Sequence, residues 1–197
     1  MPALATSSRP PATRPRQRAC GFTLIEAALT TVIVGTGVLA LVGAQQAYSV
    51  KNDYAVRANL AQMLANEIRE LTANKPHHDP ITGTAFLGPE PGELSIQDYD
   101  DLDDFAGTVS AGLGGGLVFN PPINAAGVAL EDMDRWTQEI RVFNVWQDYI
   151  SQPDSNASLI PLGTTDVMRV TVTMRYREND GSQTTVTTMT WAVPEAD

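Results

Sequence analysis

The feature that most constrains this chain is an apolar run near its N-terminus, from Phe22 to Ala44. These 23 residues include a single charged side chain, Glu26, which lies close to the start of the run. A helix of about 20 apolar residues is long enough to cross the hydrocarbon core of a bilayer. The run therefore predicts one membrane-spanning helix, and the carboxylate within it requires an explanation.

A basic segment precedes the apolar run. It contains four prolines, little apolar surface and no acid, so it predicts a disordered leader. Its charged residues are Arg9, Arg14, Arg16 and Arg18. Basic residues before a membrane segment keep that end of the chain in the cytoplasm. An ordinary secretory signal is cut after its apolar region, whereas here no small-residue cleavage site follows Ala44. Cleavage between Gly21 and Phe22 would instead remove residues 1–21 and keep the apolar helix.

Glu26 has no use in a plain membrane anchor. A charge at the centre of a membrane helix costs ~2.5–3.5 kcal/mol on insertion scales, and intramembrane carboxylates usually have a partner. Cleavage after Gly21 would leave Phe22 with a free, cationic α-amine. The residues therefore suggest a pair between Glu26 and the Phe22 amine of a neighbouring copy in an assembly.

The hexapeptide GFTLIE, from Gly21 to Glu26, resembles the prepilin peptidase site of type IV pilins and of type II secretion pseudopilins. With the basic leader before it and the apolar run after it, the resemblance covers about residues 14–75. It implies that the prepilin peptidase cuts after Gly21 and methylates the new N-terminal Phe22. It also implies that Glu26 guides the assembly of the subunit into a filament.

On this resemblance the chain is a filament subunit and a peptidase substrate, not an enzyme. Its partners would be the peptidase, other pilin or pseudopilin subunits and the bacterial inner membrane, with the head domain in the periplasm until the subunit joins a pilus or pseudopilus. The one cysteine, Cys20, would leave with the leader. The mature chain then lacks the C-terminal disulfide of many major pilins, which favours a minor pilin or pseudopilin over a major subunit.

Two alternatives stay open at this point. The first, within the same class, is a minor pseudopilin of type II secretion. The second, of another class, is a single-pass membrane-anchored periplasmic binding domain in which the GFTLIE hexapeptide is a coincidence.

The sequence beyond residue 44 predicts how the rest of the chain is organised. Residues 45–75 continue the helix as an amphipathic stretch, because apolar residues recur at spacings of three and four. The expected stripe is Ala47, Val50, Tyr54, Ala58, Ala61, Leu64, Ile68 and Leu71. Residues 76–130, rich in proline and glycine, predict an irregular connection with short elements at most. Residues 131–197 predict the antiparallel β-sheet of a head domain.

Three strands are expected in that last part, at 136–146, 169–176 and 183–193. The last two are joined by a hairpin at Asp180-Gly181, a strong turn signal. Alternation in the second strand places its arginines and threonines, including Arg169 and Thr171, on a solvent face. A three- or four-stranded sheet packed on one long N-terminal helix gives an α+β, pilin-like fold.

Charge and motifs limit the function further. Without the leader, 9 basic and 23 acidic residues remain, a net charge of −14. Such an acidic head argues against non-specific nucleic-acid binding, which requires Lys and Arg. Residues 112–116 are rich in glycine but lack the lysine of a P-loop, so a flexible turn is expected there. The sequence shows no catalytic constellation, and no cofactor is expected apart from a candidate calcium site.

That candidate site is a cluster of five carboxylates within seven residues: Asp98, Asp100, Asp101, Asp103 and Asp104. Calcium favours several carboxylates in a flexible loop, although the spacing lacks the glycine and the final glutamate of an EF-hand. Tyr99, Leu102 and Phe105 lie between the acids and favour a short helix or turn docked by its apolar residues. A solvated loop and an acidic surface for a partner are further interpretations.

Overall fold

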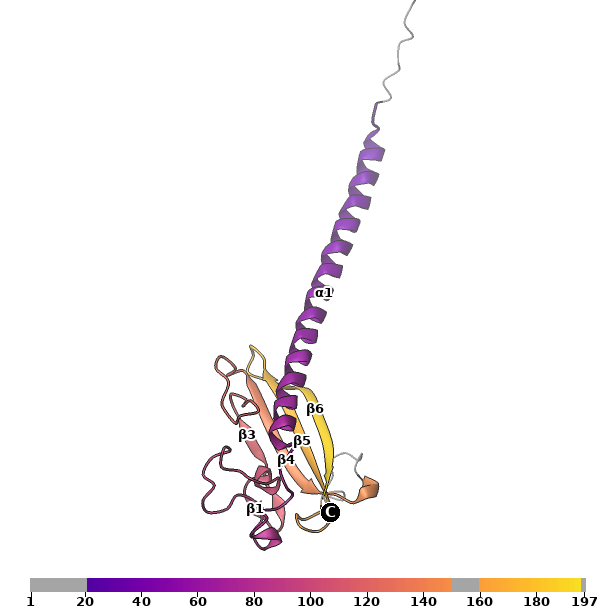
Figure 1. Cartoon of the computed structure of the whole chain (residues 1–197). Helices are drawn as coiled ribbons and strands as arrows, with labels where there is room; N and C mark the ends of the chain where they lie inside the picture. Colours follow the sequence, from indigo (N-terminus) through magenta and orange to yellow (C-terminus); the bar gives the residue numbers. More distant parts are fainter. Residues whose placement is uncertain (1–20, 150–159, 196–197) are drawn as a thin grey trace, which may run out of the picture. The chain divides into compact units, whose positions relative to one another are not determined.

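The computed structural model describes residues 21–149 and 160–195 and has an α+β fold (Figure 1). One long helix, α1 (Leu24–Thr72), comes first and is followed by short 3₁₀ helices and antiparallel strands. The chain divides into two compact units, Met1–Val50 and Lys51–Asp197. The long N-terminal helix and the antiparallel sheet expected from the sequence are confirmed.

The second unit is built on a four-stranded antiparallel sheet in the order β3-β4-β5-β6 (Figure 1). Its strands are β3 (Leu117–Phe119), β4 (Trp136–Asn144), β5 (Val167–Arg177) and β6 (Gln183–Pro194). The three predicted strands correspond to β4, β5 and β6. Strand β3 lies within the stretch expected to be irregular, so the sheet begins before residue 131. A separate two-stranded ribbon is formed by β1 (Val109–Ser110) and β2 (Leu113–Gly114).

The C-terminal part of α1 packs against this sheet. Its buried residues are Ala61, Leu64, Ala65, Ile68 and Thr72. The predicted stripe was wrong at its beginning, because Ala47, Val50 and Tyr54 are exposed. Arg57 donates to Glu178, at the β5–β6 turn, at 2.8 Å. Within the second unit, Tyr54 precedes Arg57 on α1 and so lies past this end of the sheet, without a strand to cover it.

The core between α1 and the sheet is completed by a 3₁₀ helix, η2 (Asp103–Ala106). Phe105 is fully buried and packs with Leu102 among apolar side chains of α1 and the sheet. The expected docking of this segment through its apolar residues is therefore confirmed. Gln138, also fully buried, joins three segments: its amide donates to the Leu64 carbonyl at 3.0 Å and accepts from the Ile123 amide at 3.0 Å.

The other face of the sheet is partly covered. The alternating pattern of β5 predicted that Arg169 and Thr171 lie on a solvent face. This prediction was wrong for both residues, which are only 0% and 5% exposed. The chain after β4 forms a 3₁₀ helix, η3 (Gln147–Tyr149), and Arg169 donates to the Tyr149 carbonyl at 3.5 Å. Strand alternation tells which residues share a face, but not which other segment of the chain packs on that face.

The glycine-rich stretch at 112–116 is closely packed and is not the flexible turn expected from its composition. A Cβ atom added to Gly114 would lie 2.4 Å from the Ala106 carbonyl oxygen. At Gly116, φ is +79° and an added Cβ would lie 2.7 Å from the Ile140 carbonyl oxygen. Only glycine lets the backbone approach η2 and β4 this closely.

Substitution of Gly114 with alanine is expected to lower the free energy of unfolding by ~1–3 kcal/mol, the usual cost of overpacking. The cost arises because the added methyl group meets backbone atoms, which cannot move aside as a side chain can. Thermal unfolding of the full chain in detergent would measure the effect. Gly92→Ala is the matched control, since an added Cβ there has nothing within 4 Å. Equal unfolding temperatures for the two variants would contradict the prediction.

Candidate functional site

The predicted processing site lies immediately before the first turn of α1. Thr23 caps this turn: its hydroxyl oxygen accepts from the Glu26 amide at 3.3 Å, and its carbonyl accepts from the Ala27 amide at 3.1 Å. A threonine three residues before a glutamate is the sequence signature of a capping box. A carboxylate in the first turn is also favoured by the helix dipole. This spacing of Thr23 and Glu26 can be read directly from the sequence.

The bond between Gly21 and Phe22 is accessible. Phe22 is 69% exposed, and apart from its chain neighbours no described residue has an atom within 4 Å of an added Gly21 Cβ. The ion pairs formed between described residues lie in the second unit and include Arg57–Glu178, His78–Asp103 and Glu139 with Arg141 and Arg175. Glu26 therefore has no cationic partner among the described residues of its own chain.

The described part of the first unit is one exposed apolar helix. Every residue from 21 to 50 is exposed. Threonine hydroxyls within it donate to carbonyls one turn earlier, from Thr31 to Ala27 at 2.9 Å and from Thr36 to Val32 at 3.0 Å. Such bonds satisfy polar groups without water, as a bilayer interior requires. By length and composition, α1 is able to cross a membrane.

The acidic loop between α1 and β3 is the second candidate site. Asp101, Asp103 and Asp104 are buried, at 1%, 1% and 0% exposure, while Asp98 and Asp100 are exposed. The interpretation of this cluster as a solvated loop is therefore wrong for the three buried residues. Docking of Leu102 and Phe105 into the core carries the neighbouring carboxylates inward.

Four of the five aspartates accept internal hydrogen bonds, and two of these four, Asp98 and Asp103, belong to neither group of acids whose oxygens lie close together. Asp103 accepts from the Gly88 amide at 2.8 Å with Oδ1 and pairs with His78 through Oδ2. This pair raises the pKa of His78 above its ordinary value. Asp98 accepts from the Ser95 amide and hydroxyl, at 3.0 Å and 2.8 Å. Asp100, Asp101 and Asp104 remain as the aspartates whose oxygens gather in one place.

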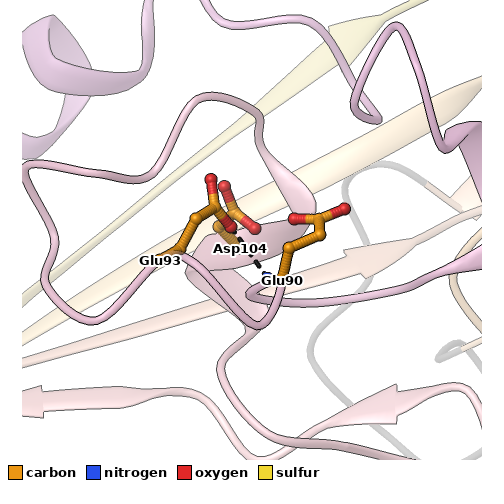
Figure 2. A group of neighbouring side chains, drawn as sticks. All are labelled: Glu90, Glu93 and Asp104. Atoms are coloured by element: carbon orange, nitrogen blue, oxygen red, sulfur yellow. Dashed lines mark hydrogen bonds between the residues drawn. The ribbon is translucent and has the colours of Figure 1, made fainter.

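The structure adds two glutamates that the sequence did not single out. One carboxylate oxygen from each of Glu90, Glu93 and Asp104 lies within 4.8 Å of the others (Figure 2). A second group, Asp100, Asp101 and Asp104, has the same spacing and shares Asp104. The only sequence signal for the glutamates was a pair of acids three residues apart in a proline- and glycine-containing turn.

The electrostatics of this acidic loop are unfavourable for ionised carboxylates. Burial, with Asp103 close by, raises the pKa of Asp101 to about 7. Burial, with Asp101 close by, raises the pKa of Asp104 to about 8, and burial also raises the pKa of Glu90. Buried carboxylates favour the neutral form unless an opposite charge is near. These side chains therefore need either a proton or an added cation.

Comparison with known proteins does not assign a function, so the function has to be inferred from the residues of this chain. No protein-family model, no curated protein and no solved structure matches the chain. The features that bear on function are the GFTLIE hexapeptide, the exposed apolar helix that follows it and the acidic loop of the second unit.

Proposed function

We propose that this chain is a minor pilin-like subunit that is processed after Gly21 by the prepilin peptidase. It then assembles through its N-terminal helix into a type IV pilus or a related filament. One observation carries the proposal: the GFTLIE hexapeptide stands at the start of a helix whose apolar side chains are exposed from its beginning to residue 50.

The exposed side chains of the first unit support an assembly role. Large apolar residues follow one another along the helix: Phe22, Leu24, Ile25, Leu29, Val32, Ile33, Val34, Val38, Leu39, Leu41 and Val42. A continuous apolar surface of this kind marks a membrane or protein interaction site. The inner membrane would cover it before assembly, and the helices of neighbouring subunits would cover it in the filament. Head-to-tail contacts between such helices do not close, so they build a filament.

Glu26 would set the axial register of that filament. Its carboxylate has no cation among the described residues of its own chain, and the α-amine of a processed Phe22 is the cation that a neighbouring subunit supplies. Pairing the two groups removes the cost of leaving a charge in an apolar helix bundle. The acidic head would lie in the periplasm until the subunit joins the filament, with no nucleic-acid partner and no catalytic role.

Two other functions differ in testable ways. A minor pseudopilin of type II secretion would be processed in the same way and would enter a pseudopilus. A membrane-anchored binding domain would not be processed.

The test is the intact mass and N-terminal sequence of the protein from membranes, with the prepilin peptidase present and absent. We expect a chain that starts at methylated Phe22 when the peptidase is present, and a chain that keeps its leader when it is absent. A leader retained in both cases would overturn the proposal and leave the anchored binding domain. Co-purification with sheared pili or with secretion components would then separate the two kinds of filament.

A further inference from the structure

The acidic loop contains more carboxylate groups than there are basic side chains near enough to pair with them. In the described part of the chain, none of Glu90, Glu93, Asp100, Asp101 and Asp104 is paired with lysine, arginine or histidine. Lys75 lies in this region, but its ammonium group donates to the Tyr99 carbonyl and not to a carboxylate. The chain as a whole is acidic, with a net charge of −10, so no excess of basic side chains compensates the cluster.

A second observation is independent of the clustering. Among the described residues, three carboxylate oxygens of this loop are buried and accept no hydrogen bond: Glu90 Oε2, Asp101 Oδ2 and Asp104 Oδ1. Asp104 is completely buried, and its other oxygen accepts from the amides of Asp100 and Asp101 at 3.0 Å and 3.2 Å. The backbone thus fixes one side of this carboxylate and leaves the other without a partner. A buried carboxylate oxygen without a partner is costly.

We propose that Glu90, Glu93 and Asp104 form a binding site for one hard divalent cation of the calcium type. Their oxygens lie within 4.8 Å of one another, about twice the Ca²⁺–oxygen distance of 2.3–2.6 Å, so that one ion reaches all three. Three carboxylates make an all-oxygen ligand set, which calcium prefers, and water completes the coordination.

The geometry favours this group over the neighbouring group of aspartates. Glu90 and Glu93 come from a turn before η2, and Asp104 comes from η2 itself, so an ion would join two segments of the loop. Figure 2 shows the carboxyl groups of Glu93 and Asp104 side by side, with Glu90 beside them. The Glu90 amide already donates to Glu93 Oε2 at 2.8 Å, which holds the two glutamates together. Both are half-buried, so the site is open to an entering ion.

This set differs from the aspartate cluster that the sequence suggested. Asp98 and Asp103 are held by their own hydrogen bonds and do not belong to the site. The bound ion would fix the turn at Glu90–Glu93 against η2, and so against the core that Phe105 enters. The proposal concerns the second unit alone and does not depend on how the apolar helix is used.

The experiment is a calcium titration of the full chain in detergent after treatment with a chelator. Calorimetry should show one saturable site, with a Kd in the range of ~10⁻⁵–10⁻³ M, as in weak sensor and extracellular sites. The unfolding temperature should rise with calcium and return to its starting value when chelator is added. Sodium chloride at the same ionic strength should not reproduce this rise.

Variants make the test specific. Glu93→Gln keeps an oxygen that accepts from the Glu90 amide but removes a charge, and it should weaken calcium binding tenfold or more. Asp104→Asn should do the same. Asp98→Asn, an exposed position in the same loop, is the matched control and should bind like the unchanged protein. Hydrogen exchange should show calcium-dependent protection of the amides at residues 90–93 in the unchanged protein.

Several results would overturn the proposal. One is the absence of calorimetric binding and of any shift in unfolding temperature at millimolar calcium. Another is an equal loss of affinity for Asp98→Asn and Glu93→Gln, which would indicate general charge screening. A third is loss of binding in Asp100→Asn with full binding in Glu93→Gln, which would place the ion among the aspartates. Glu93→Gln unfolding at the temperature of the unchanged, calcium-free protein would show that the variant is folded.

Discussion

Glu26→Ala is expected to leave cleavage after Gly21 unchanged and to reduce incorporation into filaments roughly tenfold or more. The peptide bond at Gly21 is exposed and lies outside the helix, so a change within the first turn should not block the peptidase. Assembly is different, because the substitution leaves the Phe22 α-amine of the neighbouring subunit without its partner. An unpaired charge in an apolar environment costs ~2.5–3.5 kcal/mol, and ~1.4 kcal/mol already changes an equilibrium constant tenfold. The measurement compares the variant in sheared filaments with the processed variant in membranes.

Glu26→Gln separates the two roles that this residue can have. Glutamine is accepted at the same position of a capping box, and the bond to Thr23 comes from the backbone amide of residue 26, so the variant keeps the start of the helix but loses the charge. If the carboxylate pairs with a neighbouring Phe22 amine, Glu26→Gln should behave like Glu26→Ala. Normal incorporation of Glu26→Gln would show that capping is the role of this residue, and it would remove the main support for register setting.

Phe105→Ala should have the largest effect on folding, lowering the free energy of unfolding by ~3–5 kcal/mol. The ring is fully buried and meets the Tyr99 ring edge-on, with the ring centres 5.5 Å apart. Its loss opens a cavity between α1, the sheet and η2. Because ~1 kcal/mol shifts the unfolding temperature by about 2–4 °C for a domain of this size, the shift should be ~6–20 °C. Thermal unfolding of the full chain in detergent would measure it.

Phe86→Ala provides the control for this prediction. Phe86 is 41% exposed, and its truncation removes the same atoms from a position that is not enclosed. An effect well under 1 kcal/mol is expected there. If both variants unfolded at the same temperature, Phe105 would not occupy the closed core position that the structure shows.

The sequence predicted the elements that periodicity controls. The helix was expected from Phe22 and is observed from Leu24 to Thr72, and the hairpin at Asp180-Gly181 joins β5 and β6. Both follow from local rules: apolar spacing for the helix, and turn chemistry between two alternating strands. The short edge strand β3 was not found. Its three residues carry too little pattern, and pairing with β4 defines it as a strand.

The periodic patterns of the sequence did not predict which side chains of these elements are buried. Arg169 and Thr171 alternate as solvent-facing residues should, yet both are buried, and Arg169 donates to the Tyr149 carbonyl of the segment that follows β4. Tyr54 continues the apolar stripe of α1, and it is exposed because the sheet ends before reaching it. Each outcome depends on a segment distant in the sequence.

The two candidate sites also differ in whether local sequence or tertiary packing determines them. Gly21, Phe22 and Glu26 could be proposed from sequence alone, because the hexapeptide, the basic leader and the apolar run are contiguous in the chain. The cation site could not, because Glu90 and Glu93 come within 4.8 Å of Asp104 only when η2 inserts into the core. A site within one continuous segment is determined by local sequence, whereas a site made of two segments depends on the packing energy that brings them together.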